Sequence, residues 1–285
     1  MISLEAYTDF ASVYDTFMDE TPYGEWAEYI HKLIKEYGIS KPVKRVSGAD
    51  ACKVTETSGK QIVSDEEILD SEKNLVLDLG CGTGTLTELL YAKGYDMIGV
   101  DFSQEMLNIA IAKRERSGSE ILYLCQDMRE LDLYSTVGTV ISVCDSVNYL
   151  LEDKEVIETF RLVNNYLYPG GVFIFDFNTV YKYEQVIGDT TIAENREDCS
   201  FIWDNFYHEE EHINEYDLTI FVKEKKELFR KFSETHYQRG YTLEEMKKIV
   251  EKAGLKFIKA IDADTHKTPG KESERIYIIA GEQGK

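Results

Sequence analysis

The feature that most restricts the fold is an apolar segment that runs directly into three alternating glycines. Residues 75–79 are apolar except for Asp78, and an amphipathic stretch at 83–93 comes after the glycines. The glycines are Gly80, Gly82 and Gly84. Because glycine has no Cβ, a loop of this kind can turn sharply and approach a ligand closely. The pattern predicts a buried strand, a ligand-binding turn and then a helix.

The same alternation of apolar and amphipathic segments continues along the chain. The apolar segments are 75–79, 97–100, 121–124, 140–143 and 172–175, and the amphipathic ones are 83–93, 103–116 and 153–167. Continuous apolar strands that alternate with helices are typical of a parallel sheet covered on both faces. A capped helix from 242 to 254 and two strands near 256–261 and 275–280 follow. We expect an α/β fold with a Rossmann-like, doubly wound, mostly parallel seven-stranded sheet.

Two regions depart from this alternation. Residues 7–37 have helical periodicity that is broken at Pro22 and Gly24, and 41–73 are polar and weakly patterned, as in a surface excursion. Residues 190–238 are β-rich without intervening helices, which predicts antiparallel strands inserted into the main sheet or laid over it. The predicted units are an N-terminal helical lid with the excursion (1–73), a core (74–178), an antiparallel insertion (179–240) and a C-terminal completion of the core (241–285).

The overall charge makes nucleic acid an unexpected partner. The 285 residues include 32 basic and 53 acidic side chains, for a net charge of −21. Most non-specific affinity for nucleic acid comes from neutralising phosphates with basic side chains. No apolar run approaches the ~18 residues of a membrane-spanning helix. The first ten residues also lack the basic start and apolar core of a signal peptide, so we expect a protein with no membrane partner.

The cysteines predict neither a metal site nor a disulfide framework. There are five, at positions 52, 81, 125, 144 and 199, and no two have the spacing of a metal-binding pair. Free thiols are typical of a reducing compartment, so we expect a cytoplasmic protein that binds no metal.

Two carboxylates accompany the glycine loop. Asp78 precedes it, and Asp101 ends the next strand, 17 positions past Gly84. In a doubly wound sheet, a carboxylate at that strand end can accept hydrogen bonds from both hydroxyls of a ribose. Dinucleotide sites prefer G-x-G-x-x-G, whereas the spacing here is G-x-G-x-G. An acid beside the loop repels a pyrophosphate and suits a cofactor with an ammonium group; a glycine turn without a ligand is the remaining alternative.

The run Leu77-Asp78-Leu79-Gly80-Cys81-Gly82-Thr83-Gly84 resembles the first motif of the class I S-adenosylmethionine-dependent methyltransferases. Later segments resemble that family's other motifs in order: 101–107, 126–128, 143–150 and 167–171. The resemblance covers 74–178 closely and 242–282 in outline. It implies S-adenosyl-L-methionine as cofactor, with the glycine loop around the methionine moiety, Asp78 near its amino group, Asp101 on the ribose, and Asp127 with Met128 beside the adenine.

A wider set of cofactor-binding residues follows from the same motifs and from the aromatic N-terminal region. The set is Tyr14, Tyr23, Trp26, Asp78, Gly80, Cys81, Gly82, Gly84, Asp101, Phe102, Met106, Gln126, Asp127, Met128 and Cys144. Of these, Tyr14, Tyr23 and Trp26 are candidate lid residues; the alternative is that they form the core-facing stripe of an amphipathic helix.

The resemblance favours a small-molecule acceptor. The fourth motif, Cys144-Asp145-Ser146-Val147-Asn148-Tyr149, is not the Asn/Asp-Pro-Pro-Tyr type that methylates nucleobase or glutamine amino groups. The N-terminal region and the insertion are similar to those of bacterial methyltransferases that act on glycine, sarcosine or amino sugars. We therefore expect in-line methyl transfer to nitrogen or oxygen of a small molecule. An RNA-modifying enzyme and a cofactor-binding protein without acceptor chemistry are the alternatives, and the oligomeric state is open.

Three residues are candidates for catalysis. Tyr14 could close over the reacting groups, His236 could act as a general base near neutral pH, and Arg239 could hold an anionic acceptor. The alternatives are a surface strand histidine and an exposed arginine. The acidic run 209–211 is expected to be a solvated turn.

Overall fold

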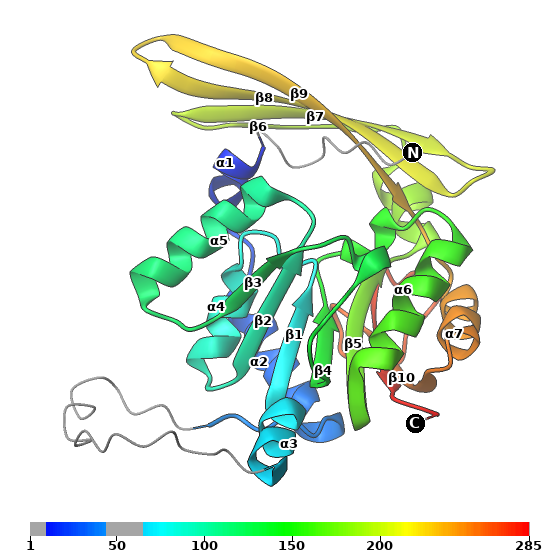
Figure 1. Ribbon diagram of the computed structural model, residues 1–285. Coiled ribbons are helices and arrows are strands. Elements are labelled where there is room, and N and C mark those ends of the chain that lie inside the picture. The colour runs from blue at the N-terminus through cyan, green and yellow to red at the C-terminus, as the bar shows by residue number, and fades with distance from the viewer. Residues whose placement is uncertain (1–9, 44–64, 285) are drawn as a thin grey trace, which may run out of the picture.

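In the computed structural model, which describes residues 10–43 and 65–284, the centre of the fold is a seven-stranded sheet. Its strand order is β10-β11-β5-β4-β1-β2-β3 (Figure 1). The strands are β1 (Leu75–Leu79), β2 (Asp96–Asp101), β3 (Leu122–Cys125), β4 (Val137–Ser142), β5 (Leu167–Asn178), β10 (Lys256–Asp262) and β11 (Arg275–Gly281). Neighbouring strands are parallel except that β11 runs antiparallel to both β5 and β10. The predicted fold class is confirmed.

Helices cover both faces of this sheet, as the continuous apolar strands require. One face packs against α2 (Tyr23–Tyr37) and α4 (Thr85–Ala92), and the other against α6 (Asp153–Tyr166) and α7 (Leu243–Lys252). A further helix, α5 (Gln104–Ser117), contacts β2 and β3. Capping boxes begin α6 and α7, with Thr242 and Glu245 satisfying each other's backbone N–H groups at α7.

The register of β1 decides which way its acid points. Leu77 and Leu79 join the apolar core on the α6 side, while Val76 belongs to the core on the α2 and α4 side. Since successive strand side chains alternate between faces, Asp78 shares the α4 side with Val76. The same parallel arrangement brings the carboxyl ends of β1, β2, β3 and β4 to one edge of the sheet.

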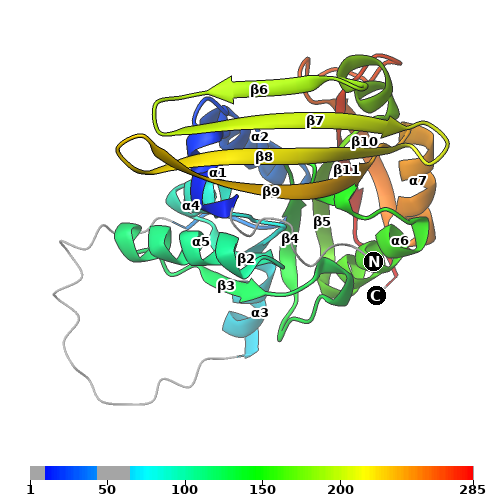
Figure 2. The ribbon, with the colours of Figure 1, turned by 90° about the horizontal axis from the view of Figure 1, so that it is seen from above.

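The β-rich insertion forms a second sheet. It is antiparallel, with the order β6-β7-β8-β9, and its strands are β6 (Thr191–Asn195), β7 (Cys199–His208), β8 (Ile213–Lys225) and β9 (Leu228–Arg239). Figures 1 and 2 show that it lies across the carboxyl edge of the main sheet. Of the two sequence-based alternatives, the strands are therefore laid over the main sheet and not inserted into it. The acidic turn at 209–211 is exposed between β7 and β8, as predicted.

A short helix fills the space beneath this second sheet. Helix α1 (Ala11–Phe17) contributes Val13 to an apolar cluster with Leu218 and Ile220 of β8. Phe17 meets Phe201 edge to face with ring centroids 4.8 Å apart. The second sheet is thus held by the N-terminal region as well as by its own connections to the core.

The interpretation of 41–73 as a surface excursion is wrong at its C-terminal end. Residues Asp65–Asn74 form α3 and lead into β1. Lys73 in its last turn complements the helix dipole. Residues 44–64 and Tyr7 lie outside the described residues. In the described part of the chain, no helix combines the length and the apolar character needed to cross a membrane.

Candidate functional site

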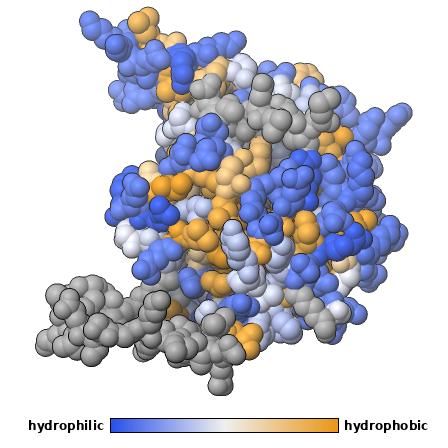
Figure 3. Space-filling view, in the orientation of Figure 1, coloured by the Kyte–Doolittle hydropathy of each residue, from blue (hydrophilic) through white to orange (hydrophobic). Residues whose placement is uncertain are grey.

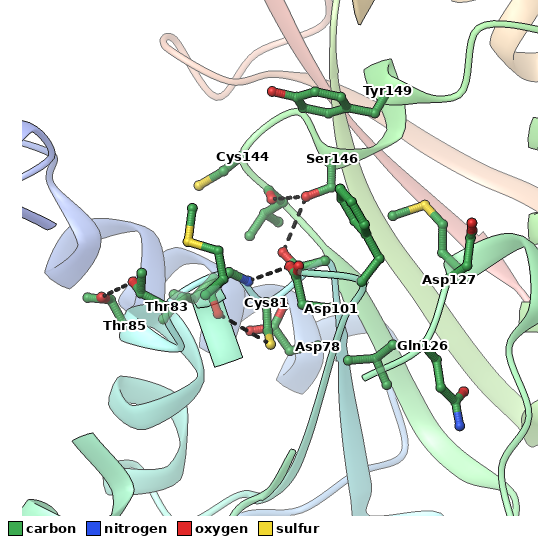
Figure 4. A pocket seen from close by; sticks show the side chains of 18 of the residues that line it. Asp78, Cys81, Thr83, Thr85, Asp101, Gln126, Asp127, Cys144, Ser146 and Tyr149 are labelled. Carbon is green, nitrogen blue, oxygen red and sulfur yellow. Dashed lines mark hydrogen bonds between the residues drawn. The ribbon is translucent and has the colours of Figure 1, made fainter. Parts of the chain in front are cut away.

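A pocket opens at the carboxyl edge of the main sheet, under the second sheet (Figure 4). Its empty space is about 1230 Å³, including open solvent at the mouth. Its lining residues are Tyr14, Tyr23, Asp78, Gly80, Cys81, Gly82, Thr83, Thr85, Leu86, Val100, Asp101, Phe102, Met106, Gln126, Asp127, Met128, Arg129, Val143, Cys144, Ser146, Tyr149 and Leu150. Figure 3 shows apolar residues reaching the surface in the middle of the face seen in Figure 1, below the second sheet.

The glycine loop forms one wall of this pocket. Gly80, Gly82 and Gly84 all have positive φ, at 80°, 54° and 72°. The N–H groups of Gly80 and Cys81 donate to the carbonyl of Val100, at 2.8 and 3.0 Å, and tie the loop to β2. A Cβ on Gly80 would lie 2.5 Å from Ser146 Oγ, so only glycine lets the loop approach the turn after β4.

Asp101 holds the loop from the end of β2. Its Oδ2 accepts the N–H of Gly82 at 2.8 Å, and its Oδ1 accepts the N–H of Ser103 at 2.9 Å. Burial raises the pKa of Asp101, and these backbone bonds oppose that shift. Each carboxylate oxygen keeps acceptor capacity for a donor in the pocket.

Asp78 is nearly completely buried, with 2% of its surface exposed. Thr87 of α4 donates to its Oδ2 at 2.6 Å, which is the consequence of the β1 register. Burial raises the pKa of Asp78 to about 7, the Thr87 bond opposes the shift, and the nearby Asp101 charge adds to it. This carboxyl group therefore changes charge near neutral pH and is sensitive to a cation placed beside it.

The wall opposite the loop comes from the segment after β3. Arg129, in the short turn η2 (Met128–Glu130), bonds to both carboxylate oxygens of Asp127 and to Glu155. Burial raises the pKa of Asp127, but the bonds from Arg129 outweigh it and the net pKa is lowered. The Gln126 side chain is held by the backbone of Asp132 at both its amide atoms. The bonds from Arg129 hold the Asp127 side chain in place in its ionised form.

The turn after β4 is strained and buttressed. Cys144 and Asp145 have positive φ, 62° and 56°, which non-glycine residues rarely adopt. Their N–H groups both donate to the buried carboxylate of Asp176 in β5, at 3.2 and 2.8 Å. Strain of this kind persists only where neighbours enforce it, and here it presents Cys144 to the pocket. Burial raises the pKa of the Cys144 thiol well above its usual range, so it stays protonated.

Helix α1 is fastened to the outer side of the glycine loop. Lys113 Nζ of α5 lies 2.7 Å from Asp15 Oδ2 and donates to Thr83 and Thr85. The hydroxyl of Thr83 in turn donates to Asp15 Oδ1 at 2.6 Å. This group of four side chains, which we call the α1 clamp, holds Tyr14 at the pocket wall.

Comparison with known proteins identifies the family. The methyltransferase domain pattern matches residues 76–171. A protein of Geobacillus sp. strain WCH70, named as a candidate methyltransferase, is 32% identical over 274 residues, which are 96% of this chain and 98% of that protein. The candidate methyltransferase YqeM of Bacillus subtilis is 32% identical over 275 residues, 96% of each chain. This chain belongs to the class I S-adenosylmethionine-dependent methyltransferases.

A solved structure supports the same assignment. The crystal structure of an S-adenosylmethionine-dependent methyltransferase from Clostridium acetobutylicum is 27% identical, with a TM-score of 0.78, over 98% of this chain and 100% of that one. The cofactor of the chain shown in Figure 1 is likewise S-adenosylmethionine.

The pocket of the methyltransferase suits that cofactor. A Cβ at Gly80 would collide with Ser146, so glycine is needed there for the close approach of the loop. A Cβ at Gly82 would meet nothing within 4 Å, so the space beside Gly82 is open. Asp101 offers a carboxylate for vicinal hydroxyls, and Asp78 offers one for an ammonium group. Phe102, Met106 and Met128 supply apolar surface for a purine.

Most of the predicted cofactor residues meet in this pocket, and four predicted residues do not line it. Gly84 lies behind the loop, where a Cβ would be 2.4 Å from Tyr123 Oη. Trp26 lines a separate small pocket, with the Arg275 guanidinium 5.5 Å from its ring. Arg239 pairs with Asp153 at 2.9 Å and lies over Tyr241, away from the pocket. His236 is 2% exposed, which excludes the surface-histidine alternative.

Nine lining residues are not among those predicted from the sequence, and five of them have polar side chains: Thr83, Thr85, Arg129, Ser146 and Tyr149. Thr83 and Thr85 alternate with the glycines, and this position in the loop could have predicted that they line the pocket. Ser146 and Tyr149 belong to η3 (Ser146–Tyr149), directly after β4, and their place at the carboxyl edge was a second one. Arg129 gave no signal, because its role depends on Glu155 in a distant helix.

Proposed function

We propose that this methyltransferase transfers a methyl group to nitrogen or oxygen of a small-molecule acceptor by in-line displacement. The observation that carries the proposal is the roof over the pocket. The second sheet and α1 cover the carboxyl edge, and the tyrosines Tyr14, Tyr23 and Tyr149 line the space beneath them. A covered, aromatic space favours a compact acceptor over a polymer.

We assign the cofactor contacts as follows. The Gly80–Gly84 backbone surrounds the methionine moiety, with Asp78 near its amino group. Asp101 binds the ribose, and Asp127 with Met128 flanks the adenine. The fixed charge of Asp127 and the free acceptor capacity of Asp101 support these roles.

The bound cofactor supplies a methyl group on a sulfonium, with a neutral thioether as leaving group. The chain's task is to align the acceptor and exclude water. The α1 clamp serves the second purpose, because it keeps Tyr14 against the glycine loop.

We also propose that the protein works in the reducing cytoplasm and that nucleic acid is not its acceptor. The net charge of −21 supports the second statement. The free thiols of the four cysteines within the described residues support the first.

The first experiment is thermal unfolding with S-adenosylmethionine, S-adenosylhomocysteine or NADH added separately. At about a hundred times its dissociation constant, a ligand of the native state adds about 2.7 kcal/mol to the free energy of unfolding. We expect a rise of several degrees with the two adenosyl compounds and none with NADH.

The acceptor is tested by transfer of radiolabelled methyl groups into the deproteinised low-molecular-mass fraction of a bacterial extract, and separately into total RNA. Label in a small molecule supports the proposal. Label in RNA alone would replace it with the RNA-modifying alternative. Cofactor binding without methyl transfer to a small molecule or to RNA would favour the third alternative, a cofactor-binding protein without acceptor chemistry.

A further inference from the structure

A buried polar chain extends from the cofactor pocket into the second sheet. Its members are Tyr149 of η3, Tyr216 of β8, and His236 and Glu234 of β9. Tyr216, His236 and Glu234 are 6%, 2% and 8% exposed. None of these four residues is among the proposed cofactor contacts.

The distances connect these groups in sequence. Tyr149 Oη lies 2.7 Å from Tyr216 Oη and 3.3 Å from His236 Nδ1. His236 Nε2 lies 3.2 Å from Glu234 Oε2. The other oxygen, Glu234 Oε1, accepts the backbone N–H of Phe10 at 3.0 Å. The Tyr216 ring stacks on the His236 imidazole at 5.0 Å and 8°, which fixes the plane of the imidazole.

These contacts assign the tautomer of His236. An ionised carboxylate only accepts hydrogen bonds, so the proton of a neutral imidazole belongs on Nε2, facing Glu234. Nδ1 is then an acceptor, and the Tyr149 hydroxyl, 3.3 Å away, is placed to donate to it. The carboxylate holds the ring in the orientation in which it can receive a proton from the phenol.

Of these four hydrogen-bonded residues, Tyr149 is the one that lines the pocket. Figure 4 shows its ring at the top of the pocket with the hydroxyl on the side of Cys144. Cys144 itself is no proton acceptor, since burial raises the pKa of its thiol. Desolvation likewise raises the pKa of the Tyr23 phenol far above its usual value. Tyr149 is distinguished from them by the imidazole and carboxylate behind it.

We propose that Tyr149 is the catalytic residue that takes the acceptor's proton, and that His236 and Glu234 are positioning residues that draw the phenol proton inward. The inference rests on the proposed function and deepens it. As the acceptor atom forms its bond to the methyl carbon, the carbon–sulfur bond breaks and its electron pair stays on sulfur. The acceptor's proton passes to Tyr149 Oη while the phenol proton passes to His236 Nδ1. The positive charge lost by the sulfonium then lies on an imidazolium facing Glu234.

The proposal narrows the acceptor class. A proton relay serves an acceptor that must lose a proton. In a hydroxyl group the proton leaves as the oxygen attacks, whereas an ammonium group must give its proton to Tyr149 before its nitrogen has a lone pair for attack. A tertiary amine or a thioether has no such proton and would not need it. General-base assistance of this kind contributes typically 10²–10⁴-fold to a rate.

The test compares wild type with Tyr149→Phe, Glu234→Gln and the control Tyr134→Phe, which alters a fully exposed tyrosine. The assay is single-turnover transfer of labelled methyl groups from S-adenosylmethionine into the low-molecular-mass extract, with calorimetric affinity for S-adenosylhomocysteine measured beside it. We expect Tyr149→Phe to slow transfer about 100-fold and Glu234→Gln about tenfold, with cofactor affinity unchanged in all variants. Transfer by Tyr149→Phe within threefold of wild type would overturn the proposal.

A second measurement does not need the acceptor. Two-bond ¹H–¹⁵N spectra of histidine-labelled protein at pH 8.5, with His236→Gln to assign the signal, report the tautomer directly. We expect the Nε2–H form in wild type and a growing Nδ1–H population in Glu234→Gln. A protonated Nδ1 in wild type would refute the relay. Wild type that binds S-adenosylhomocysteine but labels no small molecule would instead contradict the proposed function, and the tautomer would still decide the relay.

Discussion

At the scale of single residues, burial governs the two carboxylates of the cofactor pocket. Asp101 is stabilised as an anion by two backbone N–H groups, although burial raises its pKa. Asp78 has one hydroxyl donor in a nearly dry site, and its pKa rises to about 7. One acid therefore works as a fixed acceptor, and the other responds to pH and to a neighbouring cation.

Replacing Asp101 with Asn should weaken binding of S-adenosylmethionine by one to two decades. A hydrogen bond to a charged group is worth about 1.5–3 kcal/mol, and each 1.4 kcal/mol is tenfold in affinity. Isothermal calorimetry measures the change. Glu105→Gln is the matched control, since this exposed acid lies only four residues away in α5. Affinity unchanged in Asp101→Asn would remove this residue from the ribose site.

Cofactor binding should tighten as the pH rises from 6 to 8. A ligand ammonium beside Asp78 favours the ionised carboxylate, so a proton must leave Asp78 on binding when the pH is below about 7. For one such proton, the dissociation constant of S-adenosylhomocysteine falls about tenfold across this range. In Asp78→Asn, calorimetry should show a markedly flatter dependence. An equally steep dependence in the variant would assign the proton to another group.

At the scale of elements, α1 connects the cofactor pocket to the second sheet. Its Asp15 belongs to the α1 clamp on the glycine loop, while its Val13 and Phe17 pack under β7 and β8. Only seven residues long, α1 would be a marginal helix alone, so these contacts stabilise it. Helix α1 therefore joins the pocket wall to the second sheet through the α1 clamp and this apolar packing.

Asp15→Ala should release the cofactor faster. Loss of the ion pair with Lys113 and of the bond from Thr83 removes about 1 kcal/mol, which corresponds to roughly fivefold faster dissociation. Stopped-flow displacement of S-adenosylhomocysteine gives this rate. Thr16→Ala, an exposed neighbour in the same helix, should behave as wild type. If both variants release the cofactor at the wild-type rate, α1 does not control its exit.

At the scale of the whole molecule, the second sheet lies across the carboxyl edge of the main sheet, where the cofactor pocket is found. Its strand β9 contributes His236 and Glu234, which are hydrogen-bonded in sequence to Tyr149 of the core. The whole chain carries a net charge of −21. A phosphate polymer approaching this molecule therefore meets a repulsive field.

No saturable binding of tRNA or of a 20-base-pair duplex should occur near 0.15 M salt. The physical reason is that 53 acidic side chains outnumber the 32 basic ones, and only basic side chains neutralise phosphates and release their counterions. Fluorescence anisotropy with labelled tRNA and duplex measures it. Micromolar binding that weakens steeply with added salt would reveal a local basic surface and revive the RNA-modifying alternative.

The sequence determined the core of this protein because its signals are local. Apolar strands, the glycines at 80, 82 and 84, and acids at fixed distances from them specify a parallel sheet whose carboxyl ends meet. Thirteen of the fifteen predicted cofactor residues line one pocket; Trp26 and Gly84 are the two that do not. The sequence did not predict α3, because residues 41–73 are polar and weakly patterned.

Only the tertiary structure decided what surrounds that core. The sequence left His236 between a candidate general base and a surface histidine, because alternation along β9 does not say which face another element covers. Tyr149 and His236 are 87 residues apart, and their contact exists because β9 returns from the second sheet beside η3. Arg239 pairs with Asp153 of α6 and does not line the pocket. Pairings between distant segments depend on how sheets stack, and no single segment encodes that geometry.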